Sequence, residues 1–257
     1  MEKVKVFLSD PQILFREGIH FILSGEDDFE VTGETTGNEE AFSLIQANPP
    51  NIAILSLHDT KTDGLEITRR IRRNLSSVYV ILITDENEPE NILLVLKSGA
   101  SARINKDTEP EHLLDIIRVV AQGSLPIMEE LFNPDVASLV ITEFTDLTTL
   151  SDEFSEMLAS LAPKELQILN SIAAKNTIDQ VAAKVEMTED NVRRNIRMIL
   201  NKLVSNDQAR TIIEAAQRSM PSIIRTGKRE LRSDYITRAE FNEFKDRLME
   251  RLKSLIV

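Results

Sequence analysis

The feature that most constrains this chain is the regular alternation of short apolar segments with amphipathic ones over its first 123 residues. Short apolar runs bounded by turn residues predict buried strands, and apolar residues spaced by three and four predict helices. The expected strands are 4–8, 29–33, 52–55, 78–83 and 102–104. The expected helices are 12–23, 38–47, 65–73, 88–97 and 109–121, with a turn at Asp63-Gly64. This order predicts a doubly wound, five-stranded parallel sheet, which places ligand sites at the carboxyl ends of its strands.

The middle of the chain has no strand pattern. Residues 124–160 are interpreted as a partly helical linker with one helix over 136–144 and a polar hinge over 145–151. Residues 161–217 predict four helices, which begin near Pro163, Thr177, Thr188, and Asn206 or Asp207. Two short helices joined by a tight turn make a helix-turn-helix. The expected fold class is therefore α/β plus all-α, with domains at 1–123 and 161–217.

The last segment, 218–257, begins with a polar and basic stretch that is expected to be flexible. From Thr237 onward the pattern predicts a helix with a single apolar stripe. The stripe consists of Phe241, Phe244, Leu248, Leu252 and Leu255. Such a stripe either packs on its own chain or pairs with a second copy in a short coiled coil, and the sequence leaves both readings open.

Charge restricts the functional classes. The 257 residues include 42 acidic and 30 basic side chains, for a net charge of −12. This balance argues against a general nucleic-acid binder, but it is a whole-chain average, and a local basic face can still bind DNA.

Several other classes lack their signatures. Cysteine is absent, so there is no disulfide, thiol nucleophile or thiolate zinc site. His20, His58 and His112 have no ligand spacing, and no glycine-rich phosphate loop is present. We therefore expect neither an enzyme nor a metal or cofactor. The start of the chain is not a signal peptide and no long apolar run follows, so a soluble cytoplasmic protein is expected.

The first domain carries four segments in a specific order: FLSDPQILFREGI, ILSLHDTKTDGLE, LITD and SGASARINKD. Through them, residues 3–123 resemble the receiver domain of two-component response regulators of the NarL type. The resemblance implies a phosphoacceptor Asp after the third strand and two acidic residues that hold Mg²⁺. It also implies a hydroxyl after the fourth strand and a lysine after the fifth. Asp10, Thr84 and Lys106 match the first acid, the hydroxyl and the lysine.

Other positions depart from the receiver pattern. The phosphoacceptor position is Ser56, and the second acidic position is Pro11. A serine hydroxyl without a base is a poor acceptor, and a proline side chain cannot ligate metal. Asp85 replaces a small residue, and Arg103 stands where the family has an aromatic switch residue. The resemblance thus predicts a degenerate receiver that is not phosphorylated by the usual route.

Three roles remain open for what is left of this pocket. Lys106 can pair with Asp10 and Asp85 in a structural salt bridge. The pocket can hold a different ligand, or the pairing can hold the domain in one constitutive state. Asp59, on the following loop, is a further acceptor candidate, although its position does not fit the expected geometry.

The helical domain carries the segments LAPKELQILNSIAA and NTIDQVAAKVEMTEDNVRRNIRMILNKL. Through them, residues 161–216 resemble the LuxR-type helix-turn-helix, with a recognition helix over 189–203. The candidate DNA contacts on this helix are Asn191, Arg193, Arg194, Asn195, Arg197 and Lys202. Glu186 replaces the glycine that the family has before the helix, and Asp190 replaces a lysine. Glu189 and Asp190 favour the helix N-terminus electrostatically but repel phosphates, so weaker or more dimer-dependent DNA binding is expected.

The leading hypothesis is a DNA-binding transcriptional regulator that is controlled independently of aspartyl phosphorylation. It is expected to form a homodimer through the apolar stripe of the terminal helix. Control then comes from a protein partner, a small ligand or dimer assembly. The alternative is a protein-interaction scaffold that has lost DNA binding. The net charge, Glu186 and Asp190 favour the scaffold, and the arginine cluster favours the regulator.

Overall fold

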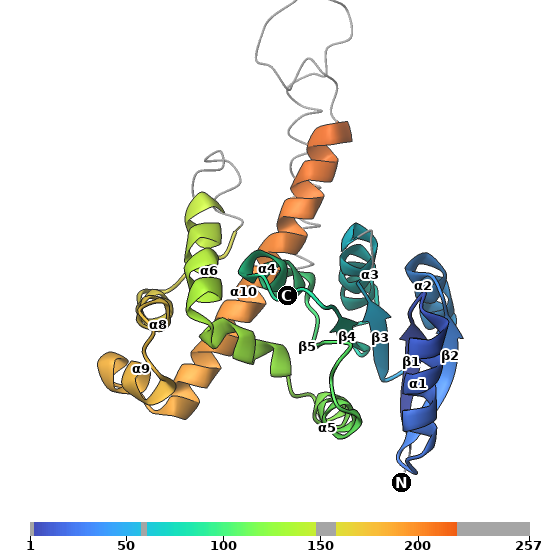
Figure 1. The fold of residues 1–257 in the computed structure, drawn as a ribbon. Helices are drawn as coiled ribbons and strands as arrows, with labels where there is room; N and C mark the ends of the chain where they lie inside the picture. The colour runs from blue at the N-terminus through green and yellow to red at the C-terminus, as the bar shows by residue number, and fades with distance from the viewer. Residues whose placement is uncertain (1–2, 58–60, 148–157, 220–257) are drawn as a thin grey trace, which may run out of the picture.

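The computed structural model describes residues 3–57, 61–147 and 158–219 (Figure 1). Its N-terminal part contains a parallel five-stranded sheet in the order β2-β1-β3-β4-β5. The strands are β1 Val4–Ser9, β2 Phe29–Thr35, β3 Ile52–Ser56, β4 Tyr79–Ile83 and β5 Ala102–Ile104. The predicted doubly wound sheet is therefore confirmed, with each strand within a few residues of its expected position.

Helices cover both faces of this sheet. One face packs against α1 (Ile13–Ser24) and α5 (Pro110–Ala121). The other packs against α2 (Asn38–Ala47), α3 (Lys61–Asn74) and α4 (Pro89–Ser98). All five residues of the central strand β3 are buried, which explains why its sequence is a continuous apolar run rather than an alternating one.

The expected turn at Asp63-Gly64 was wrong, because both residues lie inside α3. The glycine meets a different requirement, which is close packing against the end of β3. A Cβ atom at Gly64 would lie 2.5 Å from the Leu57 side chain and 3.2 Å from the Ser56 carbonyl oxygen. A larger residue here would require the Leu57 side chain to move and the Ser56 carbonyl group to shift slightly.

The linker is a packed part of the structure. It contains a 3-10 helix, η1 (Pro126–Phe132), followed by α6 (Pro134–Leu147), which includes the helix expected over 136–144. The side-chain oxygen of Asn133 accepts the Asp135 backbone N–H at 2.9 Å and begins α6 in the manner of an N-cap. The apolar residues of both elements are buried: Ile127, Leu131, Val136, Ala137, Val140 and Phe144. Most of the expected hinge at 145–151 lies outside the described residues.

The helical domain contains α8 (Pro163–Ala173), α9 (Ile178–Val185) and α10 (Glu189–Ser219). The four-helix prediction was wrong, since α10 is one continuous helix of 31 residues. The two candidate caps of the missing fourth helix make tertiary contacts instead. The Asn206 side chain exchanges two hydrogen bonds of 2.8 Å with the Ala159 backbone. Asp207 forms an ion pair with Arg69 of α3 at 2.6 Å.

The two predicted domains share one hydrophobic core. Buried residues of α4, α6, α8, α9 and α10 belong to the same cluster as α2 and α3. Figure 1 shows α10 running past α4 and α6, and α10 contacts both α4 and η1. The Arg69–Asp207 pair and the pairing of Lys97 in α4 with Glu143 in α6 join the same elements by charge. The sheet domain and the DNA-reading candidate are thus docked together.

The predicted C-terminal helix and its five apolar residues, Phe241, Phe244, Leu248, Leu252 and Leu255, lie outside the described residues. In the part of the chain that is described, no helix has the length and apolar character needed to cross a membrane.

Candidate functional site

The sheet brings the predicted pocket residues to one edge, as expected for parallel strands. Asp10 follows β1, Ser56 ends β3 and Thr84 follows β4, and all three are buried. Lys106 follows β5 and is half-buried. The position of these four residues is therefore that predicted from the sequence, while their contacts differ from the expectation.

Asp10 is held in place by hydrogen bonds from Gln12 and Arg16. Its Oδ1 accepts the Gln12 N–H at 2.6 Å, and its carbonyl oxygen accepts a hydrogen bond from the Arg16 guanidinium at 2.8 Å. Its other carboxylate oxygen, Oδ2, is buried and has no hydrogen-bond partner. The neighbouring Pro11 is exposed. A buried carboxylate oxygen without a partner is costly, because it has lost its hydration without gaining a hydrogen bond.

Ser56 lies at the expected phosphoacceptor position but its hydroxyl is enclosed. The side chain is buried, and its Oγ makes no hydrogen bond. The Ser56 carbonyl oxygen accepts the Asn38 Nδ2–H at 3.1 Å, and Asn38 in turn accepts the Ser9 hydroxyl at 2.9 Å. No carboxylate or imidazole is bonded to Oγ that would act as a base.

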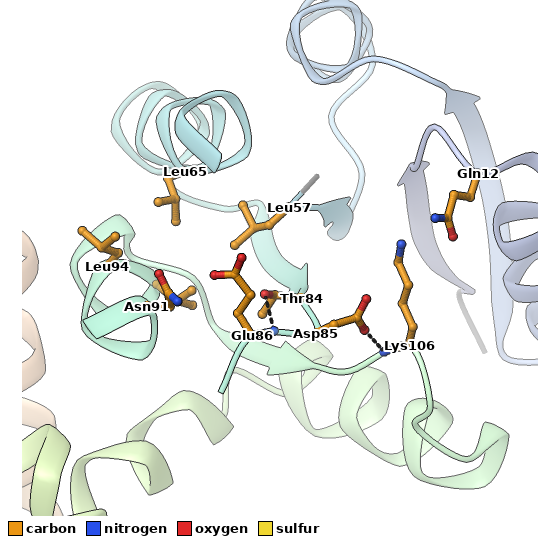
Figure 2. A pocket seen from close by; sticks show the side chains of 10 residues that line it. Gln12, Leu57, Leu65, Thr84, Asp85, Glu86, Asn91, Leu94 and Lys106 are labelled. Carbon is orange, nitrogen blue, oxygen red and sulfur yellow. Dashed lines mark hydrogen bonds between the residues drawn. The ribbon is translucent and has the colours of Figure 1, made fainter. Parts of the chain in front are cut away.

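Lys106 does not form the expected salt bridge. Its backbone N–H donates to Asp85 Oδ1 at 3.2 Å, while its Nζ lies 5.5 Å from the centroid of the Phe15 ring. Figure 2 shows the Lys106 side chain extending away from Asp85 toward Gln12. Within the described residues, no ion pair joins Lys106 to Asp10 or Asp85, because the ammonium is directed to another part of the edge.

Receiver domains imply a bound Mg²⁺, and the residues here do not fit that ion. Mg²⁺ is held by carboxylates, and only Asp10 among the expected ligand positions carries one. Pro11 offers no side-chain ligand, and Ser56 offers only a neutral, enclosed hydroxyl. Among the described residues, no group of three acidic or histidine side chains could hold a metal. Asp59 lies outside the described residues.

A cavity of about 340 Å³ opens at this edge (Figure 2). One part of its wall is apolar and the other carries charged and amide groups. The lining residues are Gln12, Leu57, Leu65, Thr84, Asp85, Glu86, Asn91, Leu94, Val95 and Lys106. Thr84 Oγ1 accepts the Glu86 N–H at 3.2 Å and so shapes the loop that forms one wall.

Arg103, at the position of the expected aromatic switch, joins this loop to the linker. Its guanidinium donates to the Glu86 carbonyl oxygen at 3.3 Å and to Asn87 Oδ1 at 2.9 Å. It also donates to Glu130 Oε1 in η1 at 3.1 and 2.9 Å. A phenylalanine could make none of these bonds, and a tyrosine hydroxyl could donate only one of them. The sequence shows that this position departs from the receiver pattern. It does not indicate the partners of Arg103, since Glu130 is 27 residues away.

The turn before α10 has an unusual backbone conformation. Glu186, which follows α9, has φ 56° and ψ 48°, a left-handed conformation that favours glycine. The residue therefore carries a local strain that glycine would avoid. The backbone conformation thus explains why glycine suits this position, and nothing in the structure explains the glutamate that replaces it.

The arginine face of α10 is largely open to solvent. Arg193, Arg194, Arg197 and Asn191 are exposed. The Asn195 amide is partly used within the helix, since it donates to the Asn191 carbonyl oxygen at 2.7 Å. Lys202 differs from the rest of the predicted set, because its Nζ donates to the buried Glu165 Oε2 at 2.7 Å and to the Ser160 carbonyl oxygen at 3.0 Å. Lys202 thus has a structural role in this conformation.

One of these arginines is already engaged by the linker. Arg193 forms an ion pair with Glu129 of η1, and its guanidinium lies 5.4 Å from the centroid of the Phe132 ring. Sequence reasoning missed this contact because the pair is separated by 64 residues. The same 3-10 helix therefore contacts the strand-end loop through Glu130 and the arginine face through Glu129.

Comparisons with known proteins agree with this arrangement. Residues 6–118 match the response regulator receiver domain family. The uncharacterized transcriptional regulatory protein YxjL of Bacillus subtilis is 25% identical over 214 residues, which cover 83% of this chain and 95% of that protein. The transcriptional regulatory protein DegU of Brevibacillus brevis is 25% identical over 83% of this chain and 93% of its own length.

A third relative gives the same picture. The nitrate/nitrite response regulator protein homolog of Haemophilus influenzae is 28% identical over 79% of this chain and 91% of its own length. All three similarities extend well beyond the receiver domain, so they include the helical domain. Each relative is matched over nearly all of its length.

Proposed function

We propose, from the match of residues 6–118 to the response regulator receiver domain family, that the chain is a DNA-binding transcriptional regulator controlled independently of aspartyl phosphorylation. The observation that carries the proposal is the exposed arginine face in the first part of α10, the second helix of the helix-turn-helix that it forms with α9. The relatives YxjL and DegU are transcriptional regulatory proteins by name, which supports the same class.

The arginine face suits the major groove. Arg193 and Arg197 are one helical turn apart, and Arg194 lies beside them. Guanidinium groups bind phosphates and read guanine edges, and an exposed amide such as that of Asn191 suits adenine. The buried side of the same helix, with Val192, packs into the core. The helix therefore presents its basic side outward while its apolar side is buried.

Control without aspartyl phosphorylation is supported by the strand-end geometry. The residue at the acceptor position is a buried serine whose hydroxyl has no base. The only carboxylate at the expected metal-binding positions is Asp10. We therefore place control in contacts between the receiver, the linker and α10, with a protein partner, a ligand or dimer assembly as the input.

We also propose that the chain acts as a homodimer through the helix expected over 237–257. A dimer would double the phosphate contacts and make binding depend steeply on salt and protein concentration. Deleting residues 234–257 should reduce the number of chains per particle, as determined by light scattering. An unchanged number of chains would assign the apolar stripe to packing within one chain.

A specific observation favours the alternative of an interaction scaffold. Arg193 is paired with Glu129, and α10 packs against α4 of the sheet domain. Part of the arginine face is therefore occupied by contacts within the chain. The net charge of −12 points the same way. The scaffold reading predicts that the arginine face binds no DNA under any salt condition.

The deciding experiment is selection of bound sequences from a randomised DNA pool, with affinities measured by fluorescence anisotropy. Arg193, Arg194 and Arg197 would be changed together to Ala. The matched control is Arg70, changed to Ala, which is also an arginine on a helix surface but lies on α3. An enriched motif that the triple variant loses and the control keeps supports the regulator. No enrichment at low salt supports the scaffold.

A further inference from the structure

The cavity at the carboxyl ends of the strands lies apart from the arginine face, and the proposed function assigns it no phosphoryl chemistry. Its volume of about 340 Å³ lies at the small end of the range of ligand pockets, roughly 300–1,000 Å³. From its lining we propose that it binds a small zwitterion with a bulky apolar group, namely an α-amino acid with a large aliphatic or aromatic side chain.

The apolar part of the wall fits such a side chain. Four apolar residues, from β3, α3 and α4 or the segments next to them, line it: Leu57, Leu65, Leu94 and Val95. In Figure 2, Leu65 and Leu94 lie together on the side of the cavity away from Lys106. Leu65 and Val95 are buried, so this wall is fixed by the core, while Leu94 is partly exposed near the opening. An apolar group bound here would be transferred from water to an apolar surface, which is favourable.

The polar part of the wall carries both signs of charge. Lys106 and Asp85 both line the cavity, and they are joined only by the Lys106 backbone N–H, not by its ammonium. Their charged ends diverge, with Lys106 reaching toward Gln12 (Figure 2). The Lys106 ammonium and the Gln12 amide can receive a carboxylate, and Asp85 can receive an ammonium.

A ligand with only one charge would fit less well. An anion such as phosphate would meet Asp85 and Glu86, and a simple cation would meet Lys106. A zwitterion places each of its charges opposite the complementary group. This match of charges, together with an apolar wall on the other side, points to an amino acid rather than to a phosphate or a metal.

The cavity is also connected to the linker. Glu86 lines it, and the Glu86 carbonyl oxygen accepts a hydrogen bond from Arg103, which is bonded to Glu130 in η1. An occupant that shifts this loop would therefore bias η1 and the Glu129–Arg193 pair. That consequence rests on the proposed function, whereas the binding itself does not.

The experiment is calorimetric titration of the full chain with three probes: L-phenylalanine, phenethylamine and 3-phenylpropionate. The two analogues each lack one charge of the amino acid. Saturable binding of L-phenylalanine is expected, with each analogue at least about tenfold weaker, because a charge-assisted hydrogen bond is lost. Absence of saturable L-phenylalanine binding, or equal affinity for all three probes, would overturn the proposal.

Variants locate the binding. Lys106→Met and Asp85→Asn should each weaken L-phenylalanine about tenfold or more, and Leu94→Trp should fill the cavity from its partly exposed position and abolish binding. Asp107→Asn, an exposed neighbour that does not line the cavity, is the matched control. Binding that survives Leu94→Trp in a folded variant would place the ligand elsewhere.

DNA affinity measured on the same preparations separates the two proposals. Intact DNA binding without ligand binding overturns only the amino-acid site. Ligand binding without DNA binding overturns only the transcriptional role.

Discussion

Glu129 of the linker and Arg193 of α10 form an ion pair across 64 residues of sequence, and Phe132 lies against the same guanidinium. The neighbouring Glu130 is bonded to Arg103 of β5. A single 3-10 helix therefore connects the receiver sheet to the proposed DNA-reading face. Any DNA phosphate that binds Arg193 must compete with the Glu129 carboxylate.

This competition leads to a first prediction. Glu129→Gln should increase DNA affinity by up to about fivefold, because exposed ion pairs contribute about 0.2–1 kcal/mol. Both partners are partly exposed, which keeps the expected effect small. Fluorescence anisotropy measures it. Glu111→Gln, which removes the same charge from an exposed position in α5, should leave affinity nearly unchanged; an equal gain would show a general charge effect instead.

The difference between what was and was not predictable follows from the range of the interactions. The sheet was predictable because a buried strand is a short local run of apolar residues, as β3 is. The pocket residues were placed correctly because parallel strands end at one edge. The contacts of Arg103 and Arg193 were not predictable, since their partners are distant in sequence and depend on how η1 docks.

The boundaries of α3 and α10 show a second limit. Glycine often marks a turn and asparagine a helix cap, and the sequence pattern predicts a turn at Gly64 and a helix start at Asn206. In the structure each serves tertiary packing, with Gly64 close to Leu57 and Asn206 bonded to Ala159. The same residue type fits a local and a tertiary role, and only the surrounding fold decides between them.

A second prediction concerns Glu186. Its left-handed backbone costs roughly 1 kcal/mol relative to glycine, so Glu186→Gly should raise the free energy of unfolding by about 0.5–1 kcal/mol. Chemical denaturation measures the change. Glu186→Gln removes the charge but keeps the strain, so it should not stabilise the fold. A stabilised Gln variant would mean that charge, rather than backbone conformation, dominates at this site.

A third prediction concerns the support of the helical domain. Glu165 is buried, and its Oε2 accepts hydrogen bonds from Lys202 Nζ and from the Ala162 N–H. Glu165→Ala should lower the free energy of unfolding by about 3 kcal/mol, the low end for breaking a buried pair, because Lys202 keeps partial contact with water.

The double variant Glu165→Met with Lys202→Met tests the cause. It should be less destabilised than the sum of the two single variants, since neither charge is then left without its partner. Strict additivity in denaturation would show that the pair itself contributes nothing.

A fourth prediction concerns acid. The side-chain hydrogen bond from Arg118 lowers the pKa of Asp28 below its usual value of 3.8. A lowered folded-state pKa stabilises the fold above the unfolded pKa, and this contribution is lost as the pH falls through the folded value. Arg118→Gln should raise the Asp28 pKa and reduce stability above pH 4, with the difference vanishing in stronger acid. An NMR titration of the Asp28 carboxyl checks the shift, and Arg194→Gln is the control that should not move it.

A fifth prediction tests the degenerate receiver directly. Incubation of the full chain with acetyl phosphate and Mg²⁺ should leave its mass unchanged, because the Ser56 hydroxyl is buried, lacks a base and has only the Asp10 carboxylate beside it at the expected metal positions. Intact-mass spectrometry provides the measurement. Ser56→Asp combined with Pro11→Asp restores the missing carboxylates, so this variant should gain a Mg²⁺-dependent phosphoryl adduct. An adduct on the unaltered chain would contradict the prediction and favour control of DNA binding by phosphorylation. An adduct on the double variant alone would show that positions 11 and 56 account for the absence of phosphorylation.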